Sequence, residues 1–214
     1  MKTNPSRKQL IGTTSWLMPG TYYQNAKLVA QQVDFVELLV YTWDQQTCDL
    51  MNSEISKLGS LSEKHGLFYT VHLPTDSIQN VVCAYEYFER SSLQIINYVL
   101  HPLNGIERFL FQNGSRVSVE NLREKIVYHQ NMTFDIGHHL LGERFDFRYT
   151  KNVNELHLMG VHDQRDHLRI DKETMQQVLE IFKEELRRIP LLCVEVFDIQ
   201  DLFESLKVLK AFLG

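Results

Sequence analysis

The chain has 214 residues, of which 43% are hydrophobic and 23% charged, so it is long enough for one domain with a sizeable core. A formal net charge of −5 and the lack of a long basic run disfavour nucleic acid as the main partner, because proteins that grip a polyphosphate carry clustered basic surfaces. No stretch of the sequence is long and apolar enough for a transmembrane helix, so we expect no membrane partner.

The N-terminus and the cysteines indicate the cellular compartment of the protein. Residues 1–8 are polar and lack the apolar stretch of a signal peptide, so we expect a flexible N-terminus rather than a leader. The three cysteines are scattered and form no C-x-x-C pair. These features predict a cytoplasmic protein, and the sequence leaves its oligomeric state open.

Eight short apolar segments follow one another along the chain, and most are followed by a stretch with helical spacing. The expected strands are 9–15, 35–41, 67–74, 98–101, 116–120, 132–135, 154–160 and 190–197. The expected helices are 22–32, 53–65 with Ser53 as N-cap, 81–96, 106–111, 122–128, 171–188 and 202–213.

Strand–helix alternation of this kind requires parallel strands joined by right-handed crossovers. Eight such units predict a closed (β/α)₈ TIM barrel that forms a single domain over residues 1–214. The main alternative is an open doubly wound sheet. Such a sheet usually carries a glycine-rich phosphate loop after its first strand, and residues 12–15 do not have that pattern.

Metal-ligand residue types stand at the carboxyl ends of six expected strands: His72, His101, Glu120, Asp135, His157 and Glu195. His138 follows Asp135 by three residues, and Gly137 leaves room for a bend between them. The loop after the seventh strand adds Asp166 and His167. Because the carboxyl ends of barrel strands meet at one mouth, we expect all these side chains to converge there.

Clustered buried carboxylates would protonate unless cations lie between them. A mixed set of imidazoles and carboxylates predicts a divalent metal, zinc in the first place, with manganese or iron as alternatives. Each residue alone has an ordinary reading as a core histidine or a strand-end charge, so the prediction depends on their shared position. His139 and His162 either donate hydrogen bonds to the metal-ligating side chains or contact the substrate, or they are surface residues.

This strand-end pattern resembles the xylose-isomerase-like barrel superfamily, which includes endonuclease IV and sugar-phosphate isomerases and epimerases. The resemblance to endonuclease IV, a three-zinc phosphodiesterase, implies that Glu120 bridges metals held by His72, His101, Asp135, His138, His157 and Glu195. The family has an Asp-x-His pair in a loop. Here Asp166 and His167 are adjacent, which departs from that pattern and puts a third metal in doubt.

A narrower resemblance is carried by residues 12–15 with Pro19 and Asn25, 33–38, 69–74 with Asp76, 98–101, 119–122, and Gly160 with 166–167. These segments look like the cobamide-remodelling phosphodiesterases, which hydrolyse the nucleotide-loop phosphodiester of corrinoids. The resemblance implies metal-assisted hydrolysis, with Glu120 or Glu195 as the catalytic residue that orients the attacking water.

We assign contacts with such a small-molecule or corrinoid substrate to residues that we expect to be exposed near the mouth. Arg165 and Arg169 could clamp a phosphate, and His162 and Trp16 could contact the rest of the substrate, although surface positions or plain packing explain these residues equally well.

Three other functions are open. A sugar or sugar-phosphate isomerase or epimerase would use one metal, held by Glu120, Asp135, His157 and Glu195. Such an enzyme does not need both His72 and His101, whereas a binuclear hydrolase does. Cleavage at apurinic sites is disfavoured by the negative charge. A barrel that only binds a ligand is disfavoured by the full ligand set.

Overall fold

Short runs of branched and aromatic residues form the strands, as is typical of parallel strands buried on both faces. The computed structural model describes residues 9–214; the predicted flexible segment 1–8 lies outside the described residues. The barrel strands are β1 (Leu10–Thr14), β2 (Phe35–Leu39), β3 (Phe68–His72), β4 (Ile95–Leu100), β5 (Val117–Glu120), β6 (Met132–Asp135), β7 (Val153–Leu158) and β10 (Leu191–Val194).

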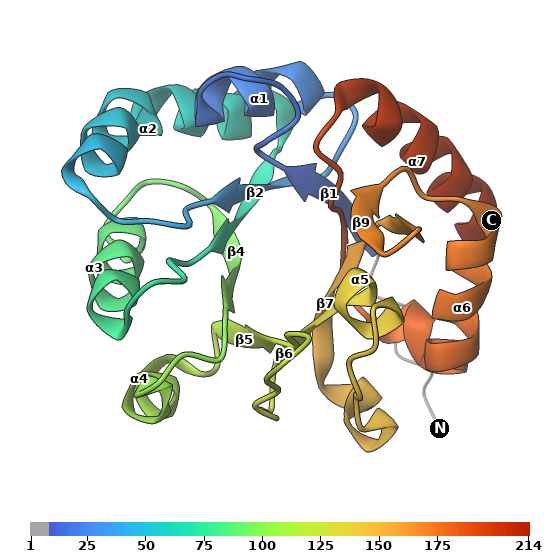
Figure 1. Cartoon of the computed structure of the whole chain (residues 1–214). Helices are drawn as coiled ribbons and strands as arrows, with labels where there is room; N and C mark the ends of the chain where they lie inside the picture. The colour runs from blue at the N-terminus through green and yellow to red at the C-terminus, as the bar shows by residue number, and fades with distance from the viewer. Residues whose placement is uncertain (1–8) are drawn as a thin grey trace, which may run out of the picture.

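These strands close into a barrel in the order β1-β10-β7-β6-β5-β4-β3-β2, and every neighbouring pair is parallel (Figure 1). The first and last barrel strands pair directly, with Leu10 opposite Leu191 and Thr13 opposite Val194. The prediction of a closed (β/α)₈ barrel is therefore confirmed.

Helices surround the strands and bury their apolar faces against the outside of the barrel (Figure 1). They are α1 (Tyr22–Val29), α2 (Gln45–His65), α3 (Ile78–Glu89), α4 (Ile106–Asn113), α5 (Ile136–Leu140), α6 (Lys172–Phe182) and α7 (Ile199–Leu213), with 3₁₀ turns η1 (Phe147–Asn152) and η2 (Lys183–Arg188). Over residues 9–214, no helix has the length and apolarity that crossing a membrane requires.

The end of the barrel interior at which the strands begin is closed by apolar side chains. Phe35 and Leu191 pack against Leu10 and Phe68, and each of these is the first residue of its strand. This plug leaves the carboxyl ends of the strands as the accessible mouth, where active sites of this fold lie.

Several helix predictions were wrong at their boundaries; the helix predicted over 171–188 ends at Phe182, where η2 follows, and the last helix begins at Ile199. The largest shifts are in α2 and α3. Helix α2 begins at Gln45 rather than at Ser53, because the side chain of Asp44 accepts a hydrogen bond from the backbone N–H of Thr47 and caps it there. Ser53 lies inside that helix and donates its hydroxyl to the carbonyl of Leu50. The helix predicted over 81–96 ends at Glu89, and Ile95 already belongs to β4.

The helix predicted over residues 122–128 does not form. Leu122 and Lys125 exchange backbone hydrogen bonds of 3.0 and 3.2 Å, which closes a tight turn in place of a helical one. The link between β5 and β6 is therefore irregular.

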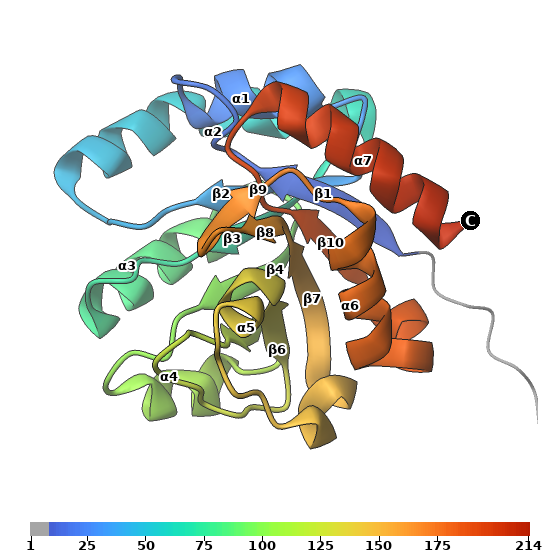
Figure 2. The ribbon, with the colours of Figure 1, turned by 45° about the vertical axis from the view of Figure 1, so that its right-hand side comes forward.

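The loop expected after β7 is a β-hairpin. Strands β8 (Gly160–His162) and β9 (Arg165–Leu168) pair antiparallel, and Asp163 and Gln164 at its tip have positive φ angles of 50° and 62°, as a two-residue type I′ turn requires. A Cβ atom on Gly160 would lie 2.1 Å from the carbonyl oxygen of Arg169, so the hairpin base needs glycine there. The hairpin packs beside α5 (Figure 2).

Candidate metal centre

Glu120 lies at the centre of the side chains that gather in the barrel mouth. Its Oε2 atom is 3.2 Å from Nε2 of His72 and 2.9 Å from Nε2 of His101. Its Oε1 atom is 3.1 Å from Nδ1 of His157. One buried carboxylate at the end of β5 therefore faces three imidazoles supplied by β3, the residue after β4, and β7.

A second set of donors adjoins the first through Glu120. Nδ1 of His157 is 3.0 Å from Oε2 of Glu195 and 4.0 Å from Oδ2 of Asp135. One donor atom from each of Glu120, Asp135, His157 and Glu195 lies within 4.8 Å of the others, and the same holds for His72, His101 and Glu120. Donors at about 2.0–2.3 Å from a common cation have separations of this order.

The electrostatics of the cluster suit a cation. Burial, together with the carboxylates of Glu195 and Glu120, raises the pKa of Asp135 to about 7 against the opposing effect of His138. Burial lowers the pKa of His157, but the surrounding carboxylates outweigh it and hold that pKa well above its usual range. The Oε2 atom of Glu195 contacts His157 without aligned hydrogen-bond geometry and has no hydrogen-bond partner among the described residues. The buried carboxylates therefore require positive charge beside them and include a free donor atom, and the residues fit a divalent metal.

The backbone around Asp135 is fixed by its neighbours. The Oδ1 atom of Asp135 accepts the backbone N–H of His138 at 2.7 Å, because Asp135 is the N-cap of α5. Asn121 binds the backbone of Asp135 on both sides, accepting from its N–H at 2.7 Å and donating to its carbonyl at 3.1 Å. Sequence reasoning missed Asn121, although its place directly after the Glu120 strand end was a signal.

His138 itself is used differently from the prediction. Its ring supplies no donor atom to either group of close ligands among the described residues. The short helix turns the chain at Asp135, so it is the backbone of His138 that contacts the centre.

The hairpin carries Asp166 and His167 to the rim of the site. Nε2 of His167 is 3.5 Å from Oε1 of Glu195, and its Nδ1 is 2.8 Å from Oδ1 of Asp166. The ring stacks on Phe197 with centroids 4.5 Å apart. Burial lowers the pKa of His167, but Glu195 and Asp166 raise it more strongly, to about 9.

The predicted substrate contacts lie outside these groups. Arg165 and Arg169 are exposed, and Nε2 of His162 is 2.9 Å from Oδ2 of Asp171, the N-cap of α6. Trp16 is 56% exposed and lines a cavity of about 310 Å³ that also contacts Leu39 at the end of β2.

His139 and Tyr41 lie around the donor groups. Nδ1 of His139 is 3.4 Å from buried Glu143, which in turn accepts a hydrogen bond from Asn121, so His139 is linked to the centre only through other residues. The ring of Tyr41 packs edge-on against His72, with centroids 4.8 Å apart.

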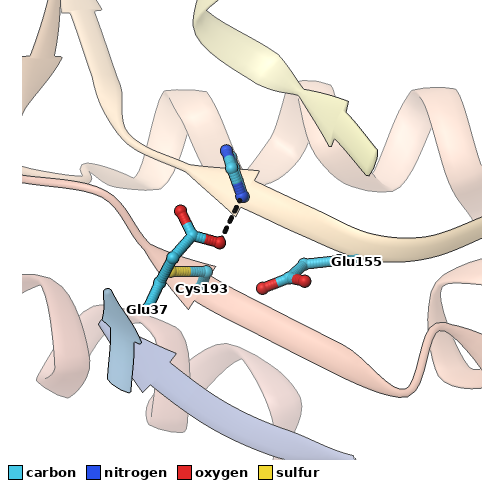
Figure 3. Close-up of side chains that lie close together, drawn as sticks. Glu37, Glu155 and Cys193 are labelled. Carbon is cyan, nitrogen blue, oxygen red and sulfur yellow. Dashed lines mark ion pairs between the residues drawn. The ribbon is translucent and has the colours of Figure 1, made fainter. Parts of the chain in front are cut away.

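The sequence interpretation also missed Glu37 and Glu155, which lie deeper in the barrel. Both are fully buried, and Oε2 of Glu37 is 3.3 Å from Nε2 of His157 (Figure 3). Glu155 precedes His157 by two positions on β7, so the strand period of two was the signal that could have found it.

Comparison of the sequence with protein-family models and with curated proteins finds no match. Solved structures do match. The crystal structure of a D-tagatose 3-epimerase-like protein aligns with a TM-score of 0.66 at 19% identity, covering 96% of this chain and 97% of that one. The crystal structure of SacUVDE aligns at 0.63 with 10% identity, covering 96% and 99%. The likeness is one of fold.

A third structure, that of AsfvAP:AG, aligns at 0.60 with 13% identity and covers 96% of this chain and 99% of that one. These alignments agree with the barrel that the broader sequence resemblance implies. They do not bear on the resemblance to cobamide-remodelling phosphodiesterases, so the reaction has to be argued from the site.

Proposed function

We propose that the protein is a metal-dependent phosphodiester hydrolase that holds two divalent cations, one on each side of Glu120. The observation that carries this proposal is the division of contacts between its two carboxylate oxygens. Oε2 faces His72 and His101, whereas Oε1 faces His157. A carboxylate with separate donor groups on its two oxygens is suited to bridge two cations.

The histidine pair distinguishes this function from a single-metal one. A single cation would be satisfied by Glu120, Asp135, His157 and Glu195, which already form a complete group. His72 and His101 would then have no role. The buried imidazole of His72 and the half-buried imidazole of His101 are explained when a second cation lies between them and Glu120.

Two bound cations would supply Lewis acidity toward phosphoryl oxygens and would lower the pKa of a water molecule. The chain's own residues supply the rest of the chemistry. Glu195 has a buried Oε2 atom without a hydrogen-bond partner among the described residues, so this atom can accept a hydrogen bond from an attacking water and orient it. His167 lies 3.5 Å from Glu195 and 2.8 Å from Asp166, a position from which its ring can donate a proton to a leaving oxygen.

The proposed substrate is the nucleotide-loop phosphodiester of a cobamide. The sequence resemblance supports it, and exposed Trp16 offers a ring surface on which a large planar ligand can pack. Arg165 and Arg169 are exposed on and next to the hairpin, where a phosphate approaching the mouth can meet their guanidinium groups.

The second candidate is a sugar or sugar-phosphate epimerase with one metal. The completeness of the group formed by Glu120, Asp135, His157 and Glu195 favours it. A D-tagatose 3-epimerase-like protein is also among the structural neighbours, at 19% identity.

Elemental analysis combined with three assays separates these functions. The metal-depleted protein is reconstituted with zinc, manganese or ferrous iron and dialysed, and the bound metal is counted. It is then assayed with bis(p-nitrophenyl) phosphate, with a cobamide under anaerobic conditions, and with ketohexoses. We expect about two cations per chain, phosphodiester turnover and release of the nucleoside from the cobamide.

Matched histidine variants sharpen the test. His101→Gln should lose one cation and the phosphodiester turnover, whereas His129→Gln should keep both, because the ring of His129 bonds to the backbone of Asn131, away from the mouth. One cation per chain with epimerisation would replace the hydrolase by the second candidate. A chain that binds no cation would refute both.

A further inference from the structure

A layer of polar side chains fills the barrel directly beneath the candidate metal centre. TIM-barrel interiors are usually filled by branched apolar residues, so this layer calls for an explanation. Its buried members are Glu37, Thr70, Asn97, Ser118, Thr133, Glu155 and Cys193. Most of them precede a mouth residue by two positions, as Glu155 precedes His157, which places both side chains on the inner face of the strand.

Most of this layer is closed by its own hydrogen bonds. Asn97 donates to Oε2 of Glu155 at 2.6 Å and to the hydroxyl of Ser118 at 2.7 Å. Ser118 in turn shares a 2.6 Å hydrogen bond with Thr133. Glu155 is therefore held from the side by Asn97, and its carboxylate makes no ion pair with the metal centre above among the described residues.

Glu37 differs because it faces upward to a mouth residue. Thr70 donates its hydroxyl to Oε2 of Glu37 at 3.2 Å, and the same oxygen lies 3.3 Å from Nε2 of His157 (Figure 3). Both Glu37 and His157 are fully buried, so water does not compete for this contact.

His157 thus connects the polar layer to the metal centre through its two ring nitrogens. Nδ1 lies 3.1 Å from Glu120 and 3.0 Å from Glu195, whereas Nε2 lies 3.3 Å from Oε2 of Glu37 and makes no aligned hydrogen bond among the described residues. A neutral imidazole has one lone pair and one N–H, so it can offer Nδ1 to a cation only when the proton is on Nε2. A buried carboxylate next to Nε2 favours that tautomer.

We propose that Glu37 is a positioning residue whose buried carboxylate, 3.3 Å from Nε2 of His157, favours a proton on that nitrogen and so leaves the Nδ1 lone pair for the cation held with Glu120, Asp135 and Glu195. This inference rests on the proposed metal centre and extends it by one residue. Glu37 touches neither the cation nor the substrate, and it acts through the tautomer and orientation of His157.

The alternative is a separate cation inside the layer, because donor atoms of Glu37, Glu155, His157 and Cys193 lie within 4.8 Å of one another. Two observations favour the positioning role. Glu155 already accepts a short hydrogen bond from Asn97. Cys193 packs in an apolar cluster with Phe35 and Leu191, surroundings that keep a thiol neutral.

The test measures zinc binding and the tautomer of His157. Metal-depleted wild type, Glu37→Gln and Glu155→Gln are titrated against a zinc-binding dye. Both substitutions replace one buried carboxyl group in the same layer by an amide at almost constant volume, and of the two residues only Glu37 makes an ion-pair contact with His157. We expect Glu37→Gln to weaken zinc binding about 10–100-fold, and Glu155→Gln to leave it unchanged.

A second readout needs no variant at Glu37. In the zinc-loaded wild type, nitrogen NMR should show a proton on Nε2 of His157 and none on Nδ1, with the signal assigned by its loss in His157→Gln. An unprotonated Nε2, or equal zinc affinity in Glu37→Gln and wild type, would overturn the inference.

Two further results would count against it. Equal weakening by both glutamine variants would show a general effect of the layer. A thiolate-to-metal absorption band in the cobalt-loaded protein that Cys193→Ser abolishes would place a cation inside the layer. If Glu195→Gln binds zinc as tightly as wild type, the metal centre itself is wrong, and that failure is separate from any result at Glu37.

Discussion

Glu120→Gln should remove both cations at once, because the carboxylate of Glu120 is the one group that both sets of donors share. The substitution keeps the size of the side chain and removes the charge that faces His72, His101 and His157 at 2.9–3.2 Å. Removing one partner of a buried ionic cluster costs about 3–5 kcal/mol of unfolding free energy. In a domain of this size, each kcal/mol moves Tm by about 2–4 °C. We therefore expect the metal-free variant to melt about 6–20 °C below the metal-free wild type.

The assay combines metal analysis after dialysis with thermal unfolding followed by circular dichroism in the presence of a chelator. Glu86→Gln is the control, because Glu86 pairs with Arg90 on the exposed face of α3, where the loss of an ion pair has little effect. The prediction is refuted if Glu120→Gln retains two cations per chain, or if its Tm in chelator equals that of the wild type.

The metal-free protein should lose stability as pH rises from about 6.5 to 9. The folded-state pKa of His167 is raised to about 9 and that of Glu155 to about 8, so the folded chain holds protons that the unfolded chain has released in this range. Thermal melts in chelator check this, and a flat or rising Tm would contradict it. Gly160→Ala should distort the hairpin base, since its Cβ would meet the carbonyl of Arg169. A fluorescent substrate analogue should then bind more weakly than to the wild type. Wild-type affinity would argue against a role for the hairpin. Asp44→Ala removes the N-cap of α2 and should lower stability by about 1 kcal/mol, which shifts Tm by about 2–4 °C; an unchanged denaturant midpoint would mean that the cap contributes nothing.

The barrel was predictable because each strand is a short, largely apolar run, and most strands have a polar residue at or next to their carboxyl end. Helix boundaries were less so. Asp44 and Ser53 are both acceptable N-caps by residue type, and only the packing of the whole segment decides between them. The hairpin at 160–168 was missed because its turn uses Asp163 and Gln164, and glutamine is not a usual residue at positive φ.

The convergence of the strand-end residues could also be predicted, since the topology fixes which end of each strand reaches the mouth. The role of His138 could not, because the N-cap at Asp135 turns the backbone and removes the ring from the donor groups. The polar layer was hidden for a different reason. Glu37 is one charged residue within an otherwise apolar strand, and its contact with His157 joins positions that only the closed barrel brings together.

Anomalous diffraction from crystals of the zinc-loaded protein would locate the cations themselves. We expect two peaks, one among His72, His101 and Glu120, and one among Glu120, Asp135, His157 and Glu195. Peaks that lie elsewhere, or a mouth in which Glu120, Asp135 and Glu195 turn away from one another and hold no zinc, would contradict it.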